Sequence, residues 1–61
     1  MFFIAKRDTG NDITINVNHI QYVDKLAAGN VSLRMKNGCR FDLDMPYNDF
    51  NAMLQNIKML Y

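Results

Sequence analysis

The 61-residue sequence lacks most of the features by which very small proteins gain extra stability. It has a single cysteine, Cys39, so no disulfide can form within the chain. With His19 as the only histidine, the sequence also predicts no closed metal site. A chain this short buries only about 60% of the surface that its unfolded form exposes. We therefore expect association with another copy to supply the missing stability.

An excess of one charge and a long apolar run are also missing. Seven basic and six acidic residues leave a net charge of +1, whereas dedicated nucleic-acid-binding domains usually carry a larger or more polarised positive charge. The apolar start MFFIA precedes Lys6 and Arg7 instead of following a basic region, so it is not typical of a secretory signal. No segment reaches the length of a membrane span. We expect a single small cytoplasmic domain over residues 1–61, bacterial or phage in style and complete as it stands.

Motifs for catalysis are not found in the sequence. The three glycines are isolated in expected turns, so there is no glycine-rich phosphate-binding loop. Asp42 and Asp44 alternate with apolar residues, which is the pattern of a solvated strand face rather than of a catalytic carboxylate pair. His19 lacks the acid or nucleophile with which a catalytic base works. We expect a protein that is not an enzyme, without catalytic residues, metal or cofactor.

The stretch VSLRMKNGCRFDL, residues 31–43, predicts a β-hairpin. A two-residue Asn-Gly turn would mix apolar and charged side chains on both faces, since opposed residues share a face. A three-residue loop over residues 36–38, closed by a left-handed glycine, instead aligns Leu33 with Phe41 and is preferred. The same register pairs Met35 with Cys39 and Val31 with Leu43, and it places Ser32, Arg34, Arg40 and Asp42 on the other face. Cys39 is then expected to be a buried, inert thiol.

Three further strand patterns and one helix pattern complete the chain. Residues 2–7, 13–17 and 20–26 are rich in strand-forming residues, and polar turns separate them. Over residues 47–61, apolar side chains recur at three- and four-residue steps, which predicts a helix with Pro46 in its first turn. The prediction is an α+β fold: an antiparallel sheet of four or five strands with one C-terminal amphipathic helix packed on one face. In the third strand the apolar set is Ile20, Tyr22 and Val23. The expected core contains Phe2 or Phe3, Ile4, Ile13, Ile15, Ile20, Val31, Leu33, Phe41, Leu43, Phe50, Ile57 and, at the centre of the helix stripe, Leu54.

The first strand is the only segment without a polar face. Phe2, Phe3 and Ile4 are consecutive, so both sides of the strand should be covered. The single helix can cover one side, and a second subunit is the simplest cover for the other. The sequence therefore predicts a homo-oligomer, most simply a dimer, that associates through these three residues.

A second candidate site is basic. It consists of Lys6, Arg7, Arg34, Lys36 and Arg40. Such a cluster can hold phosphates. However, acidic residues share the outer face of the hairpin, and no aromatic residue is expected there for base stacking. We therefore favour a small regulatory or accessory protein that binds an unidentified protein partner, with RNA or DNA binding through Arg34, Lys36 and Arg40 as the alternative.

Two segments carry a resemblance to a known family. TGNDITINVNHIQYV and LRMKNGCRFDL, followed by a short amphipathic helix, resemble the small flagellar-operon family FlbD, called SwrD in Bacillus. The matching positions are Gly10, Ile13, Ile15, Asn16 and Ile20, then Leu33, Met35, Asn37, Gly38 and Phe41. The resemblance spans nearly the whole chain. Because that family is tied to motility without a defined chemical activity, it implies a non-catalytic accessory role.

Two partial resemblances concern nucleic acids. INVNHIQYV with the Asn-Gly hairpin is similar to the end of LytTR DNA-binding domains, whose upstream portion has no counterpart here. MFFIAKR and GNVSLRM are similar to the carbon storage regulator CsrA, an RNA-binding dimer of intertwined strands. The key arginine of that regulator falls at or beside Met45, where this chain has no basic residue. These resemblances imply the nucleic-acid alternative.

Overall fold

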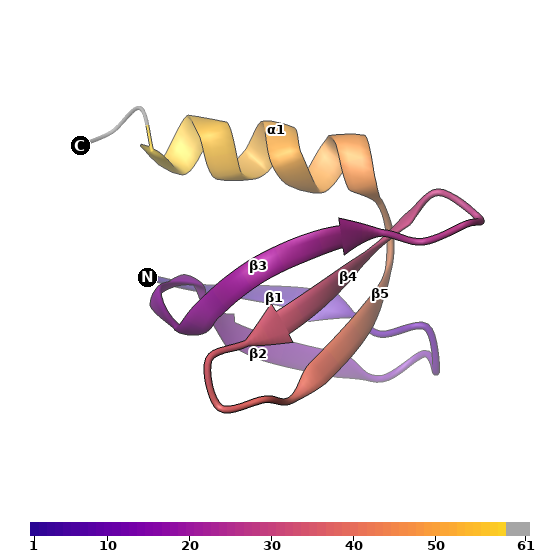
Figure 1. Cartoon of the computed structure of the whole chain (residues 1–61), viewed down its shortest axis with the longest axis horizontal. Coiled ribbons are helices and arrows are strands. Elements are labelled where there is room, and N and C mark those ends of the chain that lie inside the picture. The colour runs from indigo at the N-terminus through magenta and orange to yellow at the C-terminus, as the bar shows by residue number, and fades with distance from the viewer. Residues whose placement is uncertain (59–61) are drawn as a thin grey trace.

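The computed structural model describes residues 1–58 and has an α+β fold of antiparallel strands followed by a C-terminal helix (Figure 1). The helix begins directly after the last strand, so Pro46 ends that strand and does not lie in the first helical turn. In chain order the elements are β1 (Phe2–Lys6), β2 (Asp12–Asn16), the 3-10 turn η1 (Val17–His19), β3 (Ile20–Lys25), β4 (Asn30–Met35), β5 (Arg40–Pro46) and α1 (Tyr47–Lys58).

The strands form two antiparallel sheets, a hairpin of β1 and β2 and a three-stranded sheet in the order β3-β4-β5. In Figure 1 the hairpin lies behind the three-stranded sheet. The sheets join at one end, where Arg7 bridges Leu43 and the N–H of Asp8 donates to the carbonyl of Asp42 at 3.0 Å. The prediction of one sheet of four or five strands is not confirmed, because the bridge to β5 is made by Arg7, just beyond the end of β1.

The β4–β5 hairpin has the predicted three-residue loop. Leu33 pairs with Phe41, and the N–H of Met35 donates to the carbonyl of Cys39 at 2.8 Å. Gly38 closes the loop with a φ of 92°, a conformation that glycine adopts without steric cost. Toward the other end, the register shifts between Asn30 and Ser32. This irregularity interrupts the predicted pairing of Val31 with Leu43, although both side chains are fully buried.

The core lies between the two sheets and the helix. Phe50 of α1 is fully buried, and its ring centroid lies 5.6 Å from that of Phe3 in β1. The N–H of Tyr47 donates to the carbonyl of Gly29 at 2.9 Å, which ties the start of the helix to the β3–β4 turn. Leu54, the predicted centre of the helix stripe, is half-buried against the core. The buried apolar residues are Ala5, Ile15, Val31, Leu33, Met35, Leu43 and Phe50, with Phe3, Ile13, Ile20, Val23, Phe41, Met45, Tyr47, Met53 and Leu54 packed against them.

The placement of Ile4 in the core is wrong, since its side chain is 73% exposed. Phe3 packs against Phe50, and side chains alternate along a strand, so Phe2 and Ile4 must face outward while Ala5 faces the core. The predicted core residue Ile57 and the helix-pattern residues 59–61 lie outside the side chains that the structure describes.

Two further predictions are wrong for local reasons. No aromatic residue was expected on the outer face beside the basic residues, but a register irregularity between Ile20 and Tyr22 leaves Ile20 facing the core and turns Tyr22 to that face, where it is 46% exposed. Cys39 is exposed rather than buried. Cys39 directly follows the three-residue loop and precedes the first residue of β5, and its N–H donates to Oδ1 of Asn37 at 3.0 Å.

Candidate functional site

The outer face of the β1–β2 hairpin carries the two most exposed large apolar side chains of the described residues. Phe2 is 68% exposed and Ile4 is 73% exposed. Phe2 and Ile4 are two residues apart on one strand, so they lie about 7 Å apart on the same face. Of the three residues predicted for self-association, the structure therefore brings Phe2 and Ile4 together on the surface. Phe3 instead belongs to the core.

The outer face of the three-stranded sheet carries two rows of side chains that cross all three strands. The first row consists of Tyr22, Arg34 and Arg40, and the second of Asp24, Ser32 and Asp42. Arg34 directly opposes Arg40, as the hairpin register predicts. Like charges directly opposite each other are destabilising. The acidic row beside the basic one offsets this repulsion.

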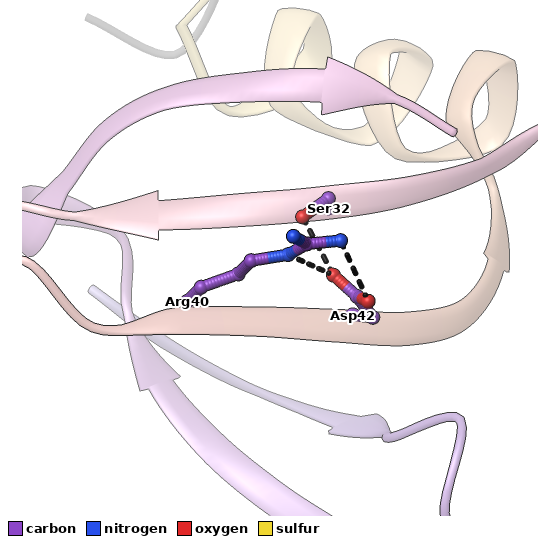
Figure 2. A network of polar contacts seen from close by, with 3 residues as sticks. All are labelled: Ser32, Arg40 and Asp42. Carbon is purple, nitrogen blue, oxygen red and sulfur yellow. Dashed lines mark hydrogen bonds and ion pairs between the residues drawn. The ribbon is translucent and has the colours of Figure 1, made fainter. Parts of the chain in front are cut away.

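Asp42 is the centre of a polar network on this face (Figure 2). Nε of Arg40 donates to Oδ1 of Asp42 at 2.9 Å, and Nη2 donates to Oδ2 at 3.1 Å. The hydroxyl of Ser32, a residue only 6% exposed, donates to the same Oδ1 at 2.6 Å. The hydrogen bonds from Arg40 and then from Ser32 lower the pKa of Asp42, and the carboxylate raises the pKa of Arg40. The guanidinium of Arg40 is therefore already paired within the chain.

The other predicted basic residues do not form one patch with Arg40. The guanidinium carbon of Arg34 lies 5.8 Å from the ring centroid of Tyr22, and that of Arg7 lies 5.4 Å from the ring centroid of Phe41. Arg7 is half-buried there, and its Nε has no hydrogen-bond partner among the described residues. Lys36 lies exposed in the hairpin loop. Lys6 lies in the other sheet, where the strand register places it opposite Asp12. Only Arg34 and Arg40, with Lys36 at the hairpin end, lie together.

A hollow of about 570 Å³ runs along β2, lined by residues 13–16 together with Phe2, His19, Met35 and Phe41. A second hollow of about 500 Å³ shares His19, Met35 and Phe41 with it and adds Lys36 and Asn37. The two hollows are therefore neighbours, with an apolar floor and a basic end. Sequence reasoning missed this feature, because it depends on how the β1–β2 hairpin packs against the end of β4 and the start of β5. His19 alone gave no signal for it.

The described part of the chain offers no arrangement typical of a metal centre. Within residues 1–58, no three His, Cys, Asp or Glu side chains lie close enough together to hold a metal ion. None of the helical structure in this range is long and apolar enough to cross a membrane.

Comparisons with known proteins find no match for this chain among protein-family models, curated proteins or solved structures.

Proposed function

We propose that this chain is a small, non-enzymatic regulatory or accessory protein that acts through protein–protein binding and self-association. The observation that supports this proposal is the exposure of Phe2 and Ile4 side by side on the outer face of β1. Single exposed apolar residues are common on protein surfaces, but adjacent ones on a domain of this size favour a contact surface. The contact is made with protein, either a partner or a second copy.

The energy available from this surface is large for so small a domain. Full burial of a Phe or Ile side chain contributes roughly 1.5–3 kcal/mol. A domain of this length has a free energy of unfolding of only about 3–9 kcal/mol. Covering both Phe2 and Ile4 would therefore add a substantial fraction of the stability of the fold. Self-association is the most direct way to gain it in a chain without a disulfide.

The cellular setting is part of the proposal. We place the protein, of bacterial or phage origin, in the bacterial cytoplasm, where an exposed, unpaired thiol such as Cys39 stays reduced. The resemblance to FlbD supports an accessory role, because that family has no defined chemical activity.

The test is capture of a partner from the native host, eluted across a salt series. Phe2→Asp and Ile4→Asp should each abolish capture of a protein partner while leaving the circular dichroism spectrum unchanged, because both side chains point into solvent. Phe3→Asp is the matched control for position and should unfold the domain, since Phe3 packs against Phe50. Equal capture by folded Phe2→Asp and Ile4→Asp variants would exclude the β1 surface.

Nucleic-acid binding is the alternative function, and one observation favours it. Tyr22 lies on the outer face beside Arg34, so the basic row does contain an aromatic ring for stacking, contrary to the sequence expectation. The pairing of Arg40 with Asp42 argues against it, because that guanidinium would have to leave its carboxylate to bind phosphate.

The two functions respond differently to salt. If RNA or DNA is the target, affinity for single-stranded oligonucleotides should fall by about tenfold or more between low and physiological salt. The double variant Arg34→Ala with Arg40→Ala should then abolish binding. A protein partner that remains bound at high salt to the double variant would instead support the β1 surface.

A further inference from the structure

We propose that β2 pairs edge to edge with β2 of a second copy, about a two-fold axis at Thr14. The two β1–β2 hairpins then form one four-stranded antiparallel sheet. This inference rests on the self-association included in the proposed function and specifies its geometry.

The backbone of β2 has a free edge in the described structure. In its sheet, β2 is bonded to β1 on one side only. The N–H of Val17 donates to the carbonyl of Met1 at 2.8 Å, and the register pairs Phe3 with Ile15, so the odd-numbered residues of β2 direct their backbone groups to β1. The backbone groups of Asp12, Thr14 and Asn16 therefore point along the opposite edge. A row of such groups is a template for another strand.

This edge lacks three of the features by which proteins usually prevent strand addition, namely a proline, a lysine and a bulge. The sequence of β2, DITIN, contains no proline and no lysine, and β2 pairs with β1 over its whole length without a bulge. The hollow of about 570 Å³ follows the edge, with Ile13, Ile15, Met35 and Phe41 among its lining residues. A strand added here would therefore place apolar side chains over an apolar floor.

A second β2 strand complements this edge in sequence as well as in shape. A two-fold axis at Thr14 is the only one that pairs all five residues of β2. It places Thr14 opposite its own copy, which is a favourable cross-strand pair, and it places Ile13 opposite Ile15. It also places Asp12 opposite Asn16, so no like charges are opposed. An axis at Asp12 would instead set two carboxylates against each other.

Charge supports the same occupant. Antiparallel pairing carries Asp12 of the second copy to the end of β2 where Asn16 lies, and His19 lines the hollow at that end. Lys36 lines the adjoining hollow, which shares His19. The acidic start of one β2 thus meets the basic end of the hollow beside the other. An apolar strand that begins with an acidic residue is the chemistry this groove fits, and β2 itself has that pattern.

The pairing has a consequence for the apolar surface. Phe2, Ile4 and Thr14 lie on the same outer face of the hairpin, so both copies present Phe2 and Ile4 on one side of the combined sheet. The two β1 strands are three strand spacings apart, about 14 Å. The dimer would offer a partner protein two apolar contacts where the single chain offers one.

The decisive test uses the fact that a residue on a two-fold axis meets its own copy. Thr14→Lys and Thr14→Glu should each weaken dimerisation by roughly tenfold or more, because like charges are brought together. An equal mixture of the two variants should form a heterodimer, which light scattering and native mass spectrometry would detect at micromolar concentration. Thr9→Lys and Thr9→Glu, in the β1–β2 turn, are matched controls and should behave as the unchanged chain. Circular dichroism checks that each variant is folded.

A covalent readout is independent of charge. Facing residues in an antiparallel pair have Cα atoms about 5.5 Å apart, within the range that a disulfide spans. Thr14→Cys in a Cys39→Ser background should therefore oxidise to a disulfide-linked dimer with an unchanged circular dichroism spectrum. Thr9→Cys in the same background should form no disulfide-linked dimer.

The outcomes separate this inference from the proposed function. Failure of the charge mixture to restore association, or dimerisation of Thr14→Lys as tight as that of the unchanged chain, overturns the β2 pairing. If Ile4→Asp dissociates the dimer while Thr14→Lys does not, the copies associate through the face of β1, and the proposed function stands without the β2 edge. A chain that is monomeric at every concentration but still captures a protein partner likewise overturns the β2 pairing and leaves partner binding standing.

Discussion

Among single residues, Asp42 has the clearest consequence for stability. Its carboxylate accepts hydrogen bonds from Arg40 and Ser32, which lower its pKa in the folded chain. As the pH falls, the unfolded chain therefore takes up this proton before the folded chain does. The stabilisation from Asp42 is fully present above the usual pKa of an aspartate and is lost as the pH falls through the lowered value.

We expect Asp42→Asn to lower the free energy of unfolding at neutral pH and to make it less dependent on pH in acid. Urea denaturation at a series of pH values between neutral and acid measures both effects. Ser32→Ala removes one of the hydrogen bonds and should cost about 1 kcal/mol at neutral pH, with a smaller change in the pH dependence. An unchanged pH dependence in Asp42→Asn would show that the network contributes nothing to folding.

The residues that the sequence places correctly are those whose position follows from a regular strand period. Arg34 opposite Arg40 follows from the loop length and alternation alone. The outward position of Tyr22 does not, because an irregularity in β3 separates it from Ile20, and the consecutive apolar residues Tyr22 and Val23 leave open which of them faces the core. In the FFIA segment alternation is equally regular, but every residue is apolar. Only the contact between Phe3 and Phe50 decides which side faces the core.

Among the elements, the β4–β5 hairpin depends on the conformation of one glycine. Gly38 has a φ of 92°, and a Cβ at this position would meet nothing within 4 Å. Any loss on substitution therefore reflects backbone strain and not a clash. We expect Gly38→Ala to lower the free energy of unfolding by roughly 1–2 kcal/mol, and Gly38→Asn to lower it by less, since Asn tolerates this conformation better. Thermal denaturation of the two variants side by side measures the difference, and an equal loss in both would contradict the strain argument.

The helix α1 is held mainly by Phe50. The periodic pattern correctly predicts an amphipathic helix, but it gives every apolar position equal weight and so makes Leu54 the centre. The structure instead buries Phe50 completely and leaves Leu54 half-buried, because the helix contacts β4 and β5 and packs Phe50 against Phe3.

We expect Phe50→Ala to destabilise the domain by about 3–5 kcal/mol, and Leu54→Ala by clearly less than that. The larger loss approaches the whole stability of a domain of this length. Chemical denaturation followed by circular dichroism gives both values, with Ala52→Ser on the exposed side of α1 as the control. A larger loss for Leu54→Ala than for Phe50→Ala would contradict this account of the helix packing.

For the whole molecule, the two sheets differ in how much of their surface is already covered or paired. The three-stranded sheet has one face in the core and a self-paired polar network on the other, whereas the β1–β2 hairpin exposes an apolar face and a free edge. The sequence predicted the surplus apolar surface of the first strand. It did not predict the free edge of β2, because in one continuous sheet of five strands β2 would be paired with a neighbour on both sides.

Amide hydrogen exchange at several protein concentrations tests the free edge of β2 directly. In the single chain, the N–H groups of Ile13 and Ile15 face β1 and should exchange slowly at every concentration, whereas those of Thr14 and Asn16 face the free edge and should exchange quickly. If the copies pair along β2, exchange at Thr14 and Asn16 should slow as the concentration rises through the dissociation constant, because those groups become paired only in the dimer. The melting temperature should rise over the same range, since the second copy binds only the folded chain. Thr14→Lys should remove both effects while Thr9→Lys keeps them. Rapid exchange at Thr14 in a sample that light scattering shows to be dimeric would place the contact elsewhere, most directly on the exposed face formed by Phe2 and Ile4.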